Sequence, residues 1–222
     1  MVEEAVSGQK SAVIIKTPLT KEDVLGLKIG DMVLISGKIV TGRDRVHKYL
    51  FNEKPKKDEI PFDLKGSILY HCGPIITKRS NKLKVTSDEL LTQTLNTDTE
   101  LRLIAGGPTT SIRVEMYEPW VIREYGIRGI IGKGGMGSKT LEAMRECGCV
   151  YLHSISGAAV YLADRVKRII DGWKIEEFGM PEAMWLFEVE DFPAIVTMDA
   201  YGNSLHREIE KISMENLKIL LG

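Results

Sequence analysis

The stretch Ile127-Arg-Gly-Ile-Ile-Gly-Lys-Gly-Gly-Met-Gly-Ser138 leads from a short apolar run through a glycine loop into a helical pattern. Residues 127–131 predict a strand, residues 132–137 the loop, residues 138–147 a helix and residues 150–153 another strand. A strand, a helix and a second strand in succession are typical of parallel pairing in an α/β fold. This stretch therefore indicates the fold class of the second half of the chain.

The segments on both sides extend the pattern into a mixed α/β architecture. The first half is rich in strands, and Thr20 with Asp23 has the spacing of a capping box that opens a short helix. Strands are predicted at residues 12–16, 32–40 with a break at Gly37, 67–71, 101–105, and as a pair or bulged ribbon at 185–189 and 194–198. Helices are predicted at residues 43–51, from about 111 with a kink or break at Pro119, at 158–171 ending near Gly172, and at 205–221 as an amphipathic helix.

Residues 78–101 are polar, with a weak helical pattern at residues 88–95. They interrupt the succession of apolar strands and predict a surface insertion. The chain contains no internal repeat. We therefore expect residues 1–222 to form one domain that carries a polar insertion near 78–101.

Composition excludes several classes of protein. The 30 Lys and Arg residues balance 31 Asp and Glu residues, which gives no global support for nucleic-acid binding. No apolar run approaches the roughly 20 residues of a membrane span, and the acidic N-terminus lacks the pattern of a signal peptide. We expect a cytoplasmic protein with no membrane partner. The three cysteines, Cys72, Cys147 and Cys149, are too few for a four-cysteine cluster, so we expect buried thiols and no cluster bound by this chain alone.

Gly107-Pro-Thr-Thr-Ser-Ile-Arg113 is the first segment that could bind an anion. A proline near a first helical turn, with hydroxyls and backbone donors, favours negative charge. Arg113 lies one turn after Thr109 and can grip a carboxylate with two hydrogen bonds. The alternative is a capped helix whose Arg113 pairs with Glu115 or Glu118.

Gly132-Lys-Gly-Gly-Met-Gly-Ser138 is the second segment. It matches G-x-G-x-x-G, but no acidic residue follows the next strand, as dinucleotide binding requires. Ser138-Lys139 also reverses the Lys-Ser order of a phosphate loop. A lysine beside a helix N-terminus remains, Lys133, either as a carboxylate contact or as an exposed residue of a tight turn.

Thr41-Gly-Arg-Asp-Arg-Val-His47 is the third segment, with Arg43 and His47 one helical turn apart. On its own it also fits a solvated first turn whose His47 packs against the sheet. All three segments adjoin junctions between strands and helices, which can converge at one edge of an α/β sheet. Together they favour a small ligand with several carboxylates.

The first and third segments, with Ile130-Ile-Gly-Lys-Gly-Gly135 and Gly148-Cys-Val-Tyr-Leu-His153, resemble the beta subunit of class I fumarate hydratases and L(+)-tartrate dehydratases, or the C-terminal domain of single-chain enzymes of this type. The similarity runs in order from about residue 14 to residue 206. The resemblance implies a three-layer β/β/α swivelling domain, a mixed sheet with flanking helices. It also implies a partner alpha subunit that holds a 4Fe-4S cluster, whose open iron acts as a Lewis acid in reversible hydration of fumarate to malate.

The same resemblance implies the site residues. Arg43, Thr110, Arg113 and Lys133 would bind the substrate carboxylates, Thr109 and Lys133 would be catalytic, with Thr109 as the base, and the partner would donate the proton. Val114 stands where the family has Met, and the segment between Cys72 and Gly106 is longer than in the family. Three alternatives stay open: a tartrate dehydratase beta subunit, an NAD-dependent oxidoreductase and a non-catalytic binding module. A homodimer of this chain within the hetero-oligomer fits symmetric assembly.

Overall fold

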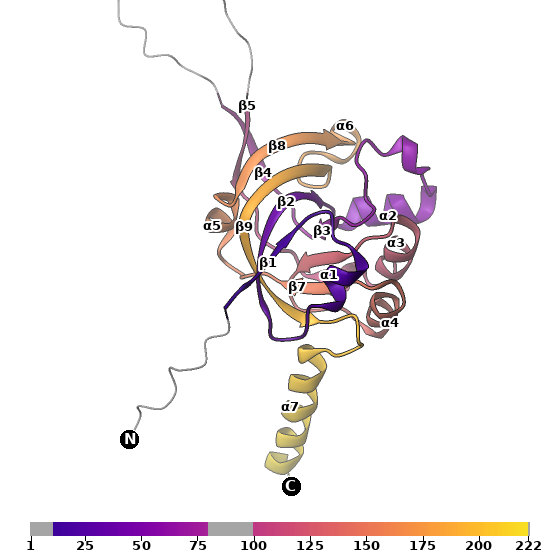
Figure 1. The fold of residues 1–222 in the computed structure, drawn as a ribbon, viewed down its shortest axis with the longest axis vertical. Helices are drawn as coiled ribbons and strands as arrows, with labels where there is room; N and C mark the ends of the chain where they lie inside the picture. The colour runs from indigo at the N-terminus through magenta and orange to yellow at the C-terminus, as the bar shows by residue number, and fades with distance from the viewer. Residues whose placement is uncertain (1–10, 80–99, 222) are drawn as a thin grey trace, which may run out of the picture.

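The computed structural model describes residues 11–79 and 100–221. Within these residues, one mixed sheet of seven strands has the order β1-β2-β3-β6-β7-β9-β8, and a separate ribbon pairs β4 with β5 (Figure 1). The strands are β1 (Val13–Lys16), β2 (Met32–Thr41), β3 (Ile68–Tyr70), β4 (Ile75–Arg79), β5 (Glu100–Ala105), β6 (Gly129–Gly132), β7 (Val150–His153), β8 (Val166–Trp173) and β9 (Met184–Met198). The helices are α1 (Lys21–Leu25), α2 (Asp44–Glu53), η1 (Lys57–Glu59), η2 (Ser111–Val114), α3 (Glu118–Tyr125), α4 (Ser138–Cys147), α5 (Ala159–Ala163), α6 (Ile175–Phe178) and α7 (Leu205–Leu221).

The direction of the strands creates one edge at which several strands end. β1, β2, β3, β6 and β7 pair with their neighbours in parallel, so their carboxyl ends lie at the same edge. The long strand β9 is antiparallel to β2, β7 and β8. Because β9 pairs with both β2 and β7, the sheet curves back on itself.

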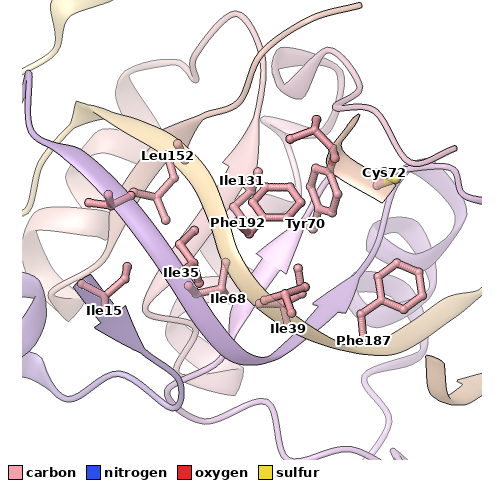
Figure 2. Close-up of a cluster of buried hydrophobic side chains, with 14 of the residues drawn as sticks. Ile15, Ile35, Ile39, Ile68, Tyr70, Cys72, Ile131, Leu152, Phe187 and Phe192 are labelled. Atoms are coloured by element: carbon pink, nitrogen blue, oxygen red, sulfur yellow. The ribbon is translucent and has the colours of Figure 1, made fainter. Parts of the chain in front are cut away.

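Alternation along the strands produces a core on each face of the sheet. Ile130 and Tyr151 belong to one buried cluster, which includes residues of α2, α3 and α4, whereas the next residues, Ile131 and Leu152, belong to the other. Figure 2 shows the second cluster, where side chains from β2, β3, β6, β7 and β9 meet. Helices α2, α3 and α4 lie together on one side of the sheet (Figure 1). The predicted mixed α/β class with flanking helices is therefore confirmed.

Several predicted elements have the predicted bounds. The helices at residues 138–147 and 205–221 and the strand at 150–153 are observed as α4, α7 and β7. The capping box is confirmed, because the Thr20 hydroxyl accepts from the Asp23 amide and the Asp23 carboxylate accepts from the Thr20 amide. Local signals decide these elements.

The predicted helix at residues 158–171 is wrong. Only the single turn α5 forms, and the chain then becomes β8, which pairs with β9 from Val166 opposite Val189 to Trp173 opposite Met184. Ile169 and Ile170 are β-branched residues that suit a strand. Pairing with the long β9 therefore outweighs the helical spacing.

Two predicted breaks lie inside continuous strands. The predicted pair at 185–189 and 194–198 is one strand, β9, which bends at Asp191, where φ is +48°. β2 likewise continues through Gly37, where φ is +107° and the register with β9 shifts. A Cβ at residue 37 would collide with the Thr17 hydroxyl, so this position requires glycine.

The segments around the predicted insertion and around Pro119 also bear on the sequence predictions. The flanks of the predicted insertion, β4 and β5, pair as an antiparallel ribbon, and the predicted helix at 88–95 lies outside the described residues. The helix expected to begin near residue 111 is broken as predicted: η2 ends at Val114, and Pro119 lies in the first turn of α3. Among the described residues, no helix is both long and apolar enough to cross a membrane.

Candidate active site

The carboxyl ends of β2, β3 and β6 place two of the predicted site residues. Arg43 comes two residues after the end of β2, and Lys133 directly follows β6. Thr109 reaches the same edge from the loop after β5, because its amide and its hydroxyl both donate to the carbonyl oxygen of His71, at 2.7 and 3.1 Å. The three predicted segments therefore meet where ligands commonly bind in α/β sheets.

Thr109 and Lys133 are neighbours through their main chains. The Lys133 amide donates to the Thr109 carbonyl at 3.3 Å, and the Ser111 amide donates to the Lys133 carbonyl at 3.1 Å. Thr110 forms the parallel bridge with Lys133, and its side chain is exposed. Within residues 11–79 and 100–221, the half-buried Lys133 ammonium has no ion-pair or hydrogen-bond partner, so its charge is free for an anion.

Arg113 pairs with a residue from the third segment. Its Nη2 donates to Asp44 Oδ2 at 2.8 Å, and both side chains are partly exposed. Neither expected partner is used, because Glu115 caps another helix and Glu118 is buried with two histidines. The pairing brings the guanidinium of Arg113 close to the start of α2.

Arg43 contacts two carboxylates. Its Nε lies 2.9 Å from Glu182 Oε1 and 3.6 Å from Asp44 Oδ2, and a quarter of the side chain is exposed. The Nε–H does not point at either oxygen, so these contacts are ion pairs without a hydrogen bond. A Cβ at residue 73 would collide with the Arg43 guanidinium, so Gly73 leaves room for this cation.

The glycine loop leads into a helix whose N-terminus is already capped. Glu115 accepts from the amides of Gly137 and Thr140, at 2.8 and 3.1 Å, and from the Thr140 hydroxyl at 2.6 Å. A dinucleotide would need its pyrophosphate at this helix start. A carboxylate in that place repels phosphate, so the geometry weighs against an NAD site. The loop instead positions Lys133 before the capped helix.

A buried chain of polar side chains lies beneath the site. Glu118 Oε2 is 2.6 Å from His47 Nε2 and 3.1 Å from His71 Nε2. His71 Nδ1 is 2.8 Å from the Ser111 hydroxyl, which is also 2.8 Å from the Tyr151 hydroxyl. All five side chains are buried.

The sequence predicts no role for His71 or Tyr151, and for Glu118 it predicts only a possible ion pair with Arg113. His71 carries one usable signal, because it directly follows strand β3, in the same way that Arg43 and Lys133 come after strands. Glu118 precedes a proline at the start of a helix, where an acid also serves an ordinary cap. Nothing local in the sequence distinguishes these two uses.

The cysteines do not fit an iron-sulfur cluster. Cys72 and Cys149 are buried and belong to different core clusters. Burial raises the pKa of the Cys72 thiol to about 12 and that of Cys149 well above its usual value, whereas cluster ligands are thiolates. In the described part of the chain, the one group of potential metal ligands is His47, His71 and Glu118, which contains no cysteine.

An open hollow of about 450 Å³ adjoins Arg113. It lies between η2 and the start of α4, with Ile112, Met116 and Lys139 in its lining. Ile112 and Met116 are 50% and 67% exposed, so this surface next to the site is partly apolar.

A family model described as Fumarase C-terminus matches residues 2–209. A protein of Geobacillus stearothermophilus with the provisional name fumarate hydratase class I is 46% identical over 96% of this chain, which spans 37% of that relative. A Methanocaldococcus jannaschii protein provisionally named L(+)-tartrate dehydratase subunit beta is 40% identical, with 92% of this chain and 96% of the relative covered. The L(+)-tartrate dehydratase subunit beta of Escherichia coli K12 is 34% identical, with 91% and 90% covered.

Proposed function

The chain belongs to the fumarase C-terminus family, and from this premise we propose that it is the beta subunit of a hydro-lyase that adds water reversibly to an unsaturated dicarboxylate. The chain would act only with an alpha subunit. The names of the two beta-subunit relatives support a separate partner, and the much longer Geobacillus relative supports a further part of the enzyme beyond this chain. We expect the partner to hold the iron-sulfur cluster, since the cysteines described above do not fit one.

The observation that carries this proposal is the set of cations around one edge of the sheet. Arg43 and Arg113 bracket Asp44, and the unpaired Lys133 adjoins Thr109. A short dicarboxylate carries two negative groups, and guanidinium groups match carboxylates in shape and charge. This set supports the assignment of Arg43, Arg113 and Lys133 as substrate-binding residues, and Thr110 beside Lys133 as a further polar contact.

Thr109 is the proposed base. In the dehydration direction its alkoxide, formed when the hydroxyl proton passes to solvent, would take a proton from the carbon next to a carboxylate. The hydroxide that leaves the neighbouring carbon would take a proton from the partner subunit and depart as water, and hydration would reverse these transfers. In the free chain, the hydroxyl donates to the His71 carbonyl, which leaves its lone pairs free for substrate. The nearby Lys133 ammonium is the group that could lower its pKa.

Fumarate is the preferred substrate, with malate as its hydration product. This preference follows the 46% identical relative, whose provisional name is fumarate hydratase class I. Tartrate is the second candidate, because the two relatives that match this chain over nearly their whole length are named tartrate dehydratase beta subunits. Both substrates present two carboxylates to the same cations.

The test is an anaerobic assay of the chain alone and of the chain co-expressed with its cluster-bearing partner. We expect hydration of fumarate only in the assembled complex. Arg113→Ala or Lys133→Ala should abolish most of this activity. Arg123→Ala, a change to an α3 arginine that pairs with Glu146, should not. A cluster-loaded complex without activity on fumarate, malate or tartrate would contradict the proposal. Full activity of Arg113→Ala would instead support a non-catalytic binding module.

A further inference from the structure

The protons in the buried chain of polar groups can be assigned from its geometry. His47 Nδ1 lies 2.8 Å from the carbonyl oxygen of Arg43, which can only accept a hydrogen bond. His47 Nε2 lies 2.6 Å from the Glu118 carboxylate. Because an ionised carboxylate can only accept, both ring nitrogens of His47 carry protons when Glu118 is ionised, and the ring is then a buried imidazolium.

His71 differs from His47 in its charge. Its Nε2 donates to Glu118, and its Nδ1 faces the Ser111 hydroxyl, which can donate to it while accepting from the Tyr151 hydroxyl. This arrangement suits a neutral ring. The charges of His47 and Glu118 then cancel, as a fully buried group requires.

The pKa values agree with this assignment. Burial alone would raise the pKa of Glu118, but the charge and hydrogen bond of His47, with the bond from His71, lower it to about 2. Burial alone would lower the pKa of His47, but Glu118 outweighs burial and raises it. For His71, burial is the stronger influence and lowers the pKa.

A metal ion would need a different geometry. His47, His71 and Glu118 each offer one ligand atom within 4.8 Å of the others. Ligand atoms around a tetrahedral zinc ion at roughly 2.0–2.2 Å lie roughly 3.3 Å apart. The 2.6 Å separation of His47 Nε2 from Glu118 Oε2 is instead a short, charge-assisted hydrogen bond. Protons, rather than a metal, join these three groups.

The two histidines of this buried chain of polar groups form hydrogen bonds with different residues of the site. His47 binds the main chain of Arg43, and the His71 carbonyl receives both hydrogen bonds from Thr109. The His71 ring binds Ser111, whose amide donates to Lys133. In the described part of the chain, Glu118 is the one side chain that bonds both histidines. It therefore connects Arg43 on one side with Thr109 and Lys133 on the other.

We propose that Glu118 is a positioning residue of the active site, which fixes the spacing between Arg43 and the Thr109–Lys133 pair by holding an imidazolium at His47 and a neutral ring at His71. The role in catalysis rests on the proposed function. The protonation states do not, since they belong to the free chain. Two separate measurements therefore test the two parts.

The first measurement is nitrogen-15 NMR of the histidine side chains in the full chain at pH 8. The charged or titratable groups that face His47 are Glu118 from α3, His71 after β3 and Asp44 on its own helix. We expect both His47 nitrogens to be protonated, although an ordinary histidine with a pKa near 6.5 would be neutral. A neutral His47 in the unmodified chain would overturn the proposal without any variant being needed.

The second measurement is steady-state kinetics of the assembled complex carrying Glu118→Gln. Misplaced contacts should raise KM for the dicarboxylate and reduce kcat/KM roughly 10- to 100-fold. The matched control is Glu124→Gln, an exposed residue of the same helix, which should change neither. In the isolated Glu118→Gln chain, His47 should lose its second proton at pH 8.

The outcomes separate the two proposals. A folded Glu118→Gln complex with unchanged KM and kcat would overturn the positioning role. If Glu118→Gln does not fold, Ser111→Ala replaces it, because it removes the hydroxyl that contacts both His71 and Tyr151 while leaving Glu118 in place. This variant should raise KM, and an unchanged KM would overturn the role. If the unmodified complex is inactive but His47 is protonated as expected, the result would contradict the proposed function and leave the assigned protonation states intact.

Discussion

The carboxylate of Asp44 lies 2.8 Å from the guanidinium of Arg113, which is 69 residues later in the chain. The same carboxylate is 3.6 Å from Arg43 Nε. One carboxylate of the chain therefore contacts both guanidinium groups that we expect to hold substrate, although Glu182 lies closer to Arg43. Such exposed pairs are worth roughly 0.2–1 kcal/mol, so a dicarboxylate can displace this contact at small cost.

Asp44→Asn should therefore tighten substrate binding. The change removes a negative charge that repels the dianion, while the orientation lost at Arg113 is worth little. We expect KM of the assembled complex to fall by about two- to fivefold at low salt, with a smaller effect at high ionic strength. A raised KM would mean that Asp44 orients the two arginines instead of competing with substrate.

Gly73→Ala should act on Arg43. The added Cβ would collide with the Arg43 guanidinium and also come within 3.2 Å of the Pro181 carbonyl. Because the guanidinium is the end of a flexible side chain, it should move away, and KM should rise roughly tenfold. In an Arg43→Ala background the same glycine change should have almost no further effect on KM. Additive losses in this double-mutant cycle would contradict a direct link between the two residues.

The sequence predicts those site residues that stand just after a recognisable strand. Arg43 and Lys133 each follow a predicted strand, and parallel pairing brings those ends together. The partner of Arg113 could not be predicted, since Asp44 approaches it only through the packing of α2 near η2. The buried histidine–glutamate contacts join residues 47, 71 and 118, which only the tertiary fold places in reach.

The fold shows the same division. α4 and α7 have clear helical spacing and the predicted bounds. The sequence predicts a helix in place of β8 because residues 158–171 carry apolar side chains at helical spacing. The strand depends on pairing with β9, which is distant in the sequence. The swivelling domain implied by the family resemblance and the single-domain organisation expected for residues 1–222 remain predictions.

Glu115→Ala should destabilise the chain through the start of α4. It would leave the amides of Gly137 and Thr140 and the Thr140 hydroxyl without their acceptor. We expect the free energy of unfolding in urea to fall by about 1–3 kcal/mol. The control is Glu142→Ala, an exposed residue of the same helix, which should cost less than about 0.5 kcal/mol. Equal losses for the two variants would show that the cap contributes little.

Acidification should destabilise the isolated chain in two pH windows. Burial holds the pKa values of His71, His153 and His206 below the ordinary 6.5, so the unfolded chain takes up protons first and stability falls below pH 6.5. Glu118 has a pKa of about 2 against an ordinary 4.5, so its contribution is complete above 4.5 and is lost as pH falls toward 2. His47 changes stability in the opposite direction. Because its pKa is raised in the folded chain, its protonation stabilises the fold fully below pH 6.5, and this contribution is lost at higher pH.

Urea unfolding between pH 8 and pH 3 measures both windows. His206→Gln should make the free energy of unfolding less dependent on pH between about 6.5 and 5, since one half-buried histidine no longer titrates. Glu118→Gln should flatten the curve below pH 4.5. Curves that stay parallel to that of the unmodified chain would show that other groups cause the acid loss.

The proposed role of Thr109 as the base can be tested with two variants, one that keeps the shape of the side chain and one that keeps its hydroxyl. Thr109→Val keeps the branched side chain but removes the hydroxyl that donates to the His71 carbonyl, whereas Thr109→Ser keeps the hydroxyl. If the hydroxyl is the base, Thr109→Val should lower kcat of the assembled complex by about 10²- to 10⁴-fold, and Thr109→Ser should retain most of it.

The main chain of Thr109 should keep its position in both variants. Its amide donates a hydrogen bond to the His71 carbonyl, its carbonyl accepts one from the Lys133 amide, and neither involves the side chain. A loss of kcat in Thr109→Val with little change in KM would therefore report on proton transfer itself. A raised KM with kcat nearly unchanged would assign the hydroxyl to substrate binding. In that case the base must come from another group, and the cations Arg43, Arg113 and Lys133 would keep their proposed roles.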